Sequence, residues 1–345
     1  MRIFIAEKKH AVEQIVKHGI TDKDDVILVT FSLGVWIESI PNLSFKQIPY
    51  TELPSEYRSH PELLSQREHH HAEGWIKCRA HAYDGEGRPL ISFVPTNDGL
   101  NNYEAMIQGI ARKAEEIVIA TDDDERGAYG AKQYLDRMNL PSETPVSCIL
   151  TYMLHSNPEK VWAERSSRNW ETSGYQALAS RQSIKRLFEY WWNCNSALVF
   201  GELCKKSGLN AARVITKFEL LAMLFVATMP EKFKPDELIK RMDKWKGTGK
   251  FQDKSTLGST SSYSEIFEKM LQRGHLSRDE KHACSLTPAG QRFVSLCHPR
   301  TFDIDLPMRL ESWMNNGDIG PMRRYANTLF SRQLRYQRKN ENIES

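Results

Sequence analysis

The sequence predicts an α/β domain with a parallel sheet covered by helices on both faces, followed by a mostly α-helical, winged-helix-like region. Short apolar runs at 2–6 (RIFIA), 26–30 (VILVT) and 117–120 (IVIA) have the composition of buried strands. Helix-like stretches between and after them cover 11–18, 103–116 and 128–138. Because strands that alternate with helices favour a parallel sheet, we place this domain at 1–152.

The other segments are a polar insertion and a mostly helical second domain. Residues 41–87 are polar, without a sustained period, and are expected to form a loop-rich insertion. In the second domain, 153–345, Ser156 to Glu159 form a capping-box pattern that predicts a helix start. Helical patterns follow at 175–203, 209–226 and 263–274, then a short hairpin near 275–286 and a helix from Pro288. The order helix, helix, hairpin, helix is typical of a winged helix.

Composition narrows the class of protein. The chain has 345 residues, of which 40% are apolar and 26% charged, and it has no apolar run long enough to cross a bilayer. The amino-terminal segment is too short and too charged for a secretory signal, so we expect a cytoplasmic protein of more than one domain, with no membrane association. The six cysteines form no C-x-x-C pair, which favours free buried thiols.

Three groups of side chains have two interpretations each. The basic residues of the last stretch, interleaved with aromatic rings, suit a phosphate backbone or a solvated terminal helix. Trp191 and Trp192 either contact bases or pack in the core, and we favour the core. His69, His70 and His71 form either a metal patch or a solvated loop, and we favour the loop. The basic residues of the last stretch are Arg323, Arg324, Arg332, Arg335, Arg338 and Lys339.

Four consecutive acidic residues, 122–125, follow the buried run IVIA. Asp122 and Asp124 would project from one side of the chain and repel each other unless a cation such as Mg²⁺ lies between them. The alternative is an acidic N-cap for the next helix. Glu7 follows the first predicted strand, and because parallel strands end at one edge of a sheet, it is expected to face Asp122 and Asp124. Lys8 beside it is suited to hold a phosphate.

The two segments RIFIAEK and ATDDDERG together resemble the Toprim domain of type IA DNA topoisomerases, in which a Glu follows the first strand and D-x-D-x-E-G follows a later one. The likeness continues in order over most of the chain. SGYQALASRQSIKRLF resembles the family's A-x-x-A-R helix, LNAARVITKFELLAML its G-R-V-Q-S/T-P-x-L segment, and LGSTSSYSEIFEKMLQRGHLS its I-G-R-P-S-T-Y segment.

The resemblance implies roles for particular residues. Glu7 corresponds to the catalytic carboxylate, and Asp122, Asp124 and Glu125 to the ligands of Mg²⁺. The third acid should fall at Arg126, so either the turn shifts and Glu125 serves, or Arg126 contacts phosphate directly. The DNA contacts that the resemblance implies are Lys8, Arg126, Arg181, Arg213, Thr216 and Tyr263.

One feature of the family is missing from the sequence. Its nucleophilic tyrosine belongs to a gate domain between the last two segments named above, whereas here the chain runs on near 225–235 and has no tyrosine between Tyr190 and Tyr263. We therefore expect a topoisomerase-derived protein that binds single-stranded DNA as an accessory factor, on a mobile genetic element or in a defence system, with a possible protein partner. The alternatives are a Mg²⁺-dependent DNA nuclease and an active topoisomerase that uses a non-standard or partner tyrosine.

Overall fold

Two compact units make up the chain. A computed structural model describes residues 1–30, 41–54, 80–92, 97–171, 174–209, 215–246, 248 and 260–344. The first unit comprises Met1–Ser39 and Pro54–Ser183, and the second Ile40–Leu53 and Ile184–Ser345. The first unit therefore extends past the position 152 at which the sequence analysis placed its end, because Val161 and Tyr175 are buried in its cores.

The first unit contains a mixed sheet of six strands in the order β4-β3-β2-β1-β5-β6. β2, β1, β5 and β6 run parallel, whereas β3 is antiparallel to β2 and to β4. The expected parallel sheet is present in these four strands. The β3–β4 hairpin, whose first strand lies in the segment 41–87 that was interpreted as loops, adds two antiparallel strands. The strands are β1 (Arg2–Ala6), β2 (Val26–Val29), β3 (Ala80–Asp84), β4 (Pro89–Ser92), β5 (Glu116–Ala120) and β6 (Val146–Cys148).

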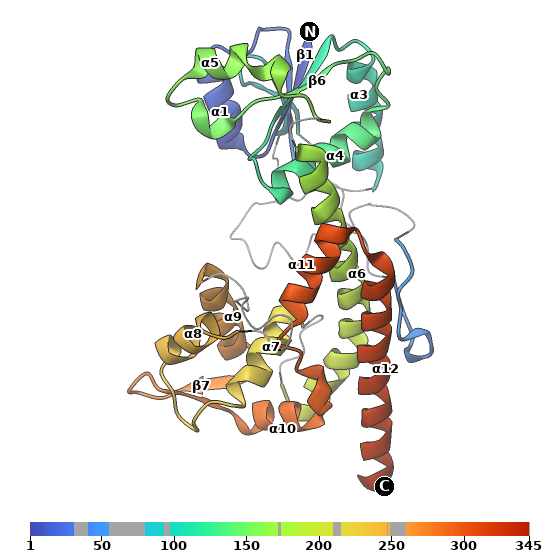
Figure 1. The fold of residues 1–345 in the computed structure, drawn as a ribbon, viewed down its shortest axis with the longest axis vertical. Coiled ribbons are helices and arrows are strands. Elements are labelled where there is room, and N and C mark those ends of the chain that lie inside the picture. The colour runs from blue at the N-terminus through green and yellow to red at the C-terminus, as the bar shows by residue number, and fades with distance from the viewer. Residues whose placement is uncertain are drawn as a thin grey trace. The chain divides into compact units, whose positions relative to one another are not determined.

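Helices cover both faces of this sheet (Figure 1). α1 (Lys9–Lys17) and α5 (Pro158–Ala163) bury Val12, Ile15 and Val161 against one face. α3 (Asn97–Ala111), α4 (Glu125–Met138) and the first turns of α6 (Tyr175–Ser207) lie on the other. Alternate residues of β1 belong to the two cores, Ile3 and Ile5 to one and Phe4 and Ala6 to the other. The short 3₁₀ turns are η1 (Phe45–Gln47), η2 (Thr151–Met153), η3 (Arg165–Ser167) and η5 (Pro299–Thr301).

The second unit is mostly helical. The order α7, α9, hairpin, α10 follows the helix, helix, hairpin, helix order expected from the sequence, and α8 lies between α7 and α9, where no helix was expected. Besides the remainder of α6, it contains α7 (Lys217–Val226), α8 (Pro235–Asp243), α9 (Thr260–Gln272), β7 (Leu276–Arg278), β8 (Cys284–Leu286), α10 (Pro288–Leu296), α11 (Leu306–Asn316) and α12 (Ile319–Glu344).

The centre of α6 supplies the core of the second unit. Trp191 is 0% exposed and Trp192 2%, which confirms their interpretation as core residues. Each indole N–H donates to a backbone carbonyl, that of Glu52 at 2.6 Å and that of Ile215 at 2.9 Å. Burial of two large rings therefore leaves no unpaired indole donor.

The described cysteines match the expectation from the sequence. Cys148, Cys194, Cys204, Cys284 and Cys297 are free and buried, as expected. Cys78 and the histidines 69–71 lie outside the described residues. No helix in the described ranges has the length and apolar character needed to cross a bilayer.

Candidate functional site

The candidate site lies at the carboxyl edge of the sheet, beside β1. β1 pairs in parallel with β2 on one side and with β5 on the other. The helices that follow β1 and β5 lie on opposite faces of the sheet, so the winding of the chain reverses here. Open α/β sheets place their ligands at such a reversal.

Glu7, Lys8 and Asp122 meet at this edge. Glu7 is 3% exposed, and its Oε2 accepts a hydrogen bond of 3.3 Å from the backbone N–H of Asp122. The Lys8 ammonium lies 3.0 Å from Glu7 Oε1 and 3.4 Å from Asp122 Oδ2. Its hydrogen bond to Glu7, together with the charges of both carboxylates, raises the pKa of Lys8. The expected approach of Glu7 to the acidic cluster is therefore present for Asp122, with a lysine between the two carboxylates.

Asp124 is the N-cap of α4. Its Oδ1 accepts hydrogen bonds of 2.8 Å from the backbone N–H groups of Arg126 and of Gly127. These are two of the donors that the first turn of a helix leaves unpaired. The alternative interpretation of the cluster as a helix cap is thus realised at this one position.

Gly127 is required by the close approach of the helix to the preceding loop. A Cβ at this position would lie 2.2 Å from the carbonyl oxygen of Asp122. One turn later, a Cβ at Gly130 would lie 2.8 Å from Oγ1 of Thr30, which follows β2. The glycines let α4 begin directly against the strand ends, and so they hold the acidic cluster at the edge.

The side chains of Glu125 and Arg126 have different surroundings. Glu125 pairs with Arg181 of α6 at 2.8 Å between Oε1 and Nε, and both side chains are about a quarter exposed. Arg126 is exposed at the surface of the edge. Within the first unit, Arg181 thus neutralises Glu125, while Arg126 is the residue whose guanidinium is presented to solvent.

Each acidic side chain that the resemblance assigns to this edge contacts another group of the chain. No group of three or more His, Cys, Asp or Glu side chains in the described ranges is placed to hold a metal ion. Glu7 and Asp122 contact Lys8, Asp124 caps α4, and Glu125 faces Arg181. The cap uses only Oδ1 of Asp124. Because Mg²⁺ commonly takes one or two carboxylates together with waters, the Mg²⁺ site that the resemblance implies stays a prediction.

Two threonines at the same edge were missed by the sequence analysis. Thr30 and Thr121 follow β2 and β5 and are both 0% exposed. The strand register places them on either side of Glu7, since Ala6 pairs with Val29 and with Ala120. Neither Oγ1 has a hydrogen-bond partner in the described structure. The sequence pattern that could have identified them is a polar residue directly after each buried strand.

Three expected DNA contacts belong to the second unit or lie outside the described residues. Arg213 lies outside them. Thr216 is the N-cap of α7 and forms a capping box with Glu219. Tyr263 is 2% exposed and packs in the core of the second unit, so the expectation that its ring stacks on a base was wrong. A buried ring offers no free face to a base.

Buried ion pairs lie at the start of α7 and were not anticipated. Lys217 is 5% exposed, and its ammonium lies 2.8 Å from Oε1 of Glu189. Burial lowers the pKa of Lys217, and the Lys217 charge, against the opposing effect of burial, holds the pKa of Glu189 below its ordinary value. Glu219, 1% exposed, contacts Arg273 in the same way. Lys217 and Glu219 are thus withdrawn from solvent, whereas their partners Glu189 and Arg273 remain partly exposed.

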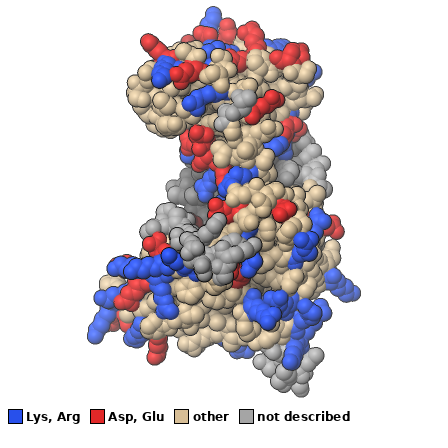
Figure 2. Space-filling model, viewed as in Figure 1, with Lys and Arg blue, Asp and Glu red and all other residues tan. Residues whose placement is uncertain are grey.

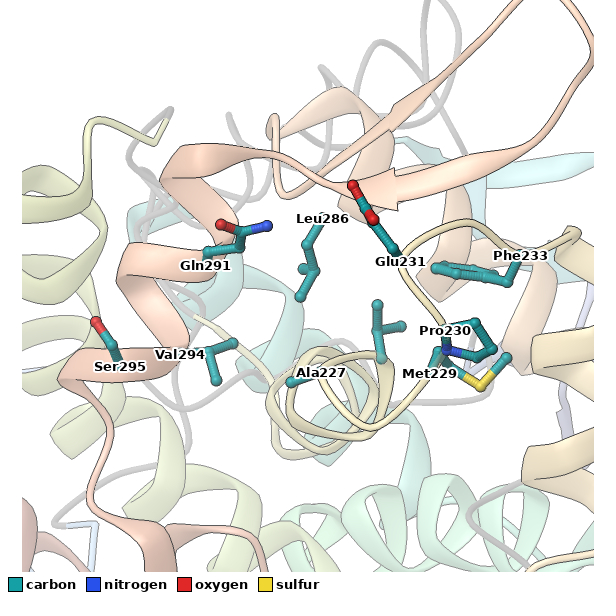
Figure 3. A pocket seen from close by; sticks show the side chains of 10 residues that line it. Ala227, Met229, Pro230, Glu231, Phe233, Leu286, Gln291, Val294 and Ser295 are labelled. Atoms are coloured by element: carbon teal, nitrogen blue, oxygen red, sulfur yellow. The ribbon is translucent and has the colours of Figure 1, made fainter.

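An apolar pocket lies beside the segment between the end of α7 and the start of α8 (Figure 3). Its volume is about 380 Å³, and Met229, Pro230 and Phe233 lie along one side of it. Glu231 and Gln291 place polar groups at its margin. The pocket therefore adjoins the stretch 225–235 in which the sequence analysis found no gate domain.

Comparison with protein-family models and with curated proteins finds no match to this chain.

Proposed function

We propose that the protein is a Toprim protein derived from type IA topoisomerases that binds single-stranded DNA as an accessory factor and does not pass strands by the tyrosine mechanism. Its first unit is proposed to be the Toprim domain and its second a winged-helix-like core. The observation that carries the proposal is the cationic pair Lys8 and Arg126 at the carboxyl edge of the sheet, where the winding reverses.

The charge of Lys8 is matched by Glu7 and Asp122, but its ammonium is 58% exposed and keeps one of its three donors for a phosphodiester. Arg126, exposed two residues after the N-cap of α4, adds a guanidinium and the favourable field of a helix N-terminus. Phosphate contacts of this kind do not depend on base sequence.

The absence of tyrosine chemistry is supported by two observations. α7 ends at Val226 and α8 begins at Pro235, and residues 227–234 between them are too few for a domain. Beside the acidic cluster, Tyr175 is 2% exposed. Burial raises the pKa of Tyr175 well above its ordinary value, and the charge of Asp123 acts in the same direction. Its phenol is therefore poorly suited to attack phosphorus.

The basic residues of α12 extend the proposal to the second unit. Figure 2 shows Lys and Arg side chains gathered over α12 at the lower right of the view. The exposed members are Arg323, Arg324, Arg335, Arg338 and Lys339. A row of exposed cations along one helix is suited to track the backbone of a single strand.

The test is binding of a labelled oligo-dT by wild type and by Lys8→Gln and Arg126→Gln across a range of salt concentrations. Each lost phosphate contact should lower the slope of log K against log salt by about 0.7 and weaken binding at low salt. Lys23→Gln is the matched control, because Lys23 is exposed and precedes β2 at the opposite edge of the sheet. Binding that is insensitive to salt, or unchanged in both variants, would refute the proposal.

Incubation with circular single-stranded and supercoiled DNA in Mg²⁺ separates the alternatives. We expect retention of the circle with no change in its covalent structure. Hydrolytic nicks would replace the proposal by a Mg²⁺-dependent nuclease at the acidic cluster. Relaxation, or a covalent protein–DNA adduct, would replace it by a topoisomerase with a non-standard or partner tyrosine.

A further inference from the structure

A second pocket in the second unit is lined by arginines. It lies between the turn η5, the start of α11 and the middle of α12, and its volume is about 350 Å³. This volume is at the lower end of the range for small-molecule sites and is comparable to that of one nucleotide. Arg300, Arg309 and Arg332 contribute to its walls, whereas Asp303 is its single acidic lining residue.

The charges in this pocket do not cancel. Arg309 lies 3.2 Å from Asp303 and 3.7 Å from Asp305, so its charge is matched. Arg300 and Arg332 have no carboxylate within ion-pairing distance among the residues that the structure describes. Burial and the charges of Arg332 and Arg300 lower the pKa of the neighbouring His298. The pocket therefore has three arginines and one carboxylate, and the charges of Arg300 and Arg332 remain unmatched.

The walls are held in place by buried hydrogen bonds. Gln333 of α12 is 0% exposed, and its Oε1 accepts from the backbone N–H of His298 at 2.8 Å and from the hydroxyl of Thr301 at 3.0 Å. Its amide donates to the carbonyl of Leu296 at 3.0 Å. The turn that carries Arg300 is thus fastened to the helix that carries Arg332, so the site is preformed.

The remaining lining suits an organic group attached to the anion. Phe302 and Tyr325 bring aromatic rings, and Leu329 adds apolar surface. Thr328 adds a hydroxyl that already donates to the carbonyl of Arg324 at 2.8 Å and can still accept a hydrogen bond. A free inorganic anion would use none of this surface, whereas a nucleotide would use both the arginines and the aromatic rings.

We propose that this pocket binds the phosphate group and attached nucleoside of a single nucleotide, through Arg300 and Arg332. Its source is a free mononucleotide or the phosphorylated 5′ end of a DNA strand. The second source rests on the proposed function, whereas the first is independent of it. Arginine is suited to this role because its planar fork donates two hydrogen bonds to a phosphate.

Titration of the full chain with dTMP, followed by calorimetry, tests the pocket directly. We expect saturable binding that Arg300→Gln and Arg332→Gln each weaken by about tenfold, the loss expected for one charged hydrogen bond. Arg292→Gln is the matched control, because Arg292 is exposed on α10 and does not line the pocket. Arg300 is exposed, so its replacement should leave the unfolding midpoint unchanged.

The two sources are separated with an oligo-dT that carries either a 5′-phosphate or a 5′-hydroxyl. A preference for the phosphorylated end that Arg332→Gln abolishes assigns the pocket to a strand end. Binding of dTMP without that preference assigns it to a free nucleotide. If dTMP does not bind and the 5′-phosphate has no effect, or if binding is equal in wild type and both variants, the proposal is overturned. Loss of binding to the 5′-hydroxyl strand in Lys8→Gln and Arg126→Gln is judged separately, because it concerns the first unit.

Discussion

Asp124 is the acid at which a helix cap and a metal ligand make opposite predictions. As a cap, it is replaceable by Asn, whose side-chain oxygen accepts the same backbone hydrogen bonds. As a metal ligand, it is not, because the amide lacks the charge that Mg²⁺ prefers. We therefore expect Asp124→Asn to leave the fold nearly as stable as wild type and Asp124→Ala to destabilise it.

The magnitude follows from the two hydrogen bonds of 2.8 Å that the carboxylate accepts. Loss of a cap costs about 1 kcal/mol, within a range of about 0.5–2 kcal/mol. Asn retains the hydrogen bonds and forgoes the attraction between a negative charge and the helix N-terminus, which is about 0.3 kcal/mol at an exposed position such as this. Asp124→Ala should thus be about 1 kcal/mol less stable than wild type, and Asp124→Asn about 0.3 kcal/mol.

Amide hydrogen exchange read by mass spectrometry is the appropriate assay, since it reports α4 separately from the second unit. Peptides that contain the amides of Arg126 and Gly127 should lose protection about fivefold in Asp124→Ala, the equivalent of 1 kcal/mol. Asp123→Ala is the control, because Asp123 is exposed and caps nothing in α4.

Measurements in Mg²⁺ and in chelator decide between the two roles. A cap makes the difference between Asp124→Asn and wild type independent of Mg²⁺. Stabilisation of wild type by Mg²⁺ that Asp124→Asn abolishes would refute the reasoning and restore Asp124 as a ligand. An Asp124→Ala variant with unchanged protection would refute the cap itself.

Three further predictions concern stability. Gly127→Ala should destabilise the first unit by about 3 kcal/mol, because its Cβ would lie 2.2 Å from a backbone oxygen; denaturant unfolding measures this. Lys217→Met should destabilise the second unit by about 1–3 kcal/mol in the same assay, since Glu189, which also pairs with Arg186 at 3.3 Å, would lose its contact with a buried ammonium. Burial lowers the pKa of His275 from its ordinary 6.5 to about 4. The unfolded chain therefore binds the proton more readily, so unfolding free energies should fall between pH 6.5 and 4, by about 3 kcal/mol in total, and His275→Leu should remove this component.

Each of these predictions has a matched control. Gly109→Ala in α3 should stabilise the chain by about 0.5–1 kcal/mol, because nothing lies within 4 Å of the added methyl group. Glu189→Gln combined with Lys217→Met should recover part of the loss, since the carboxylate that lost the lysine is neutralised as well. Equal signs for the two glycine variants, no recovery in the double variant, or a pH dependence that survives in His275→Leu would contradict the respective argument.

The strands of the first unit could be predicted because each is a short apolar run of β-branched residues. β1, β2 and β5 agree with the expected ranges to within one residue at each end. The approach of Glu7 to Asp122 was also predictable, since parallel strands end at a common edge. The hairpin β3–β4 was not, because HAYDGEGRPL has neither a sustained alternation nor a long apolar run.

The side-chain partners at the site could not be read from sequence spacing. Whether Lys8 reaches Asp122 depends on strand pairing between positions more than a hundred residues apart. Similarly, Asn195 holds the backbone of Tyr50 through two hydrogen bonds of 2.7 Å across 145 residues, which no local pattern signals. Even at α5, the cap is Asn157 in place of the expected Ser156, because both residues suit that position and packing selects one.

Because Lys8 is part of the chain, the positive charge between Glu7 and Asp122 does not depend on the ions in the solution. A dissolved cation between two carboxylates exchanges with the medium and is removed by chelation, whereas an ammonium carried by the backbone is present at a fixed stoichiometry of one. The charge balance around Glu7 is thereby inherited with the chain, and it is available as soon as the first unit folds, whatever the divalent ion content of the solution.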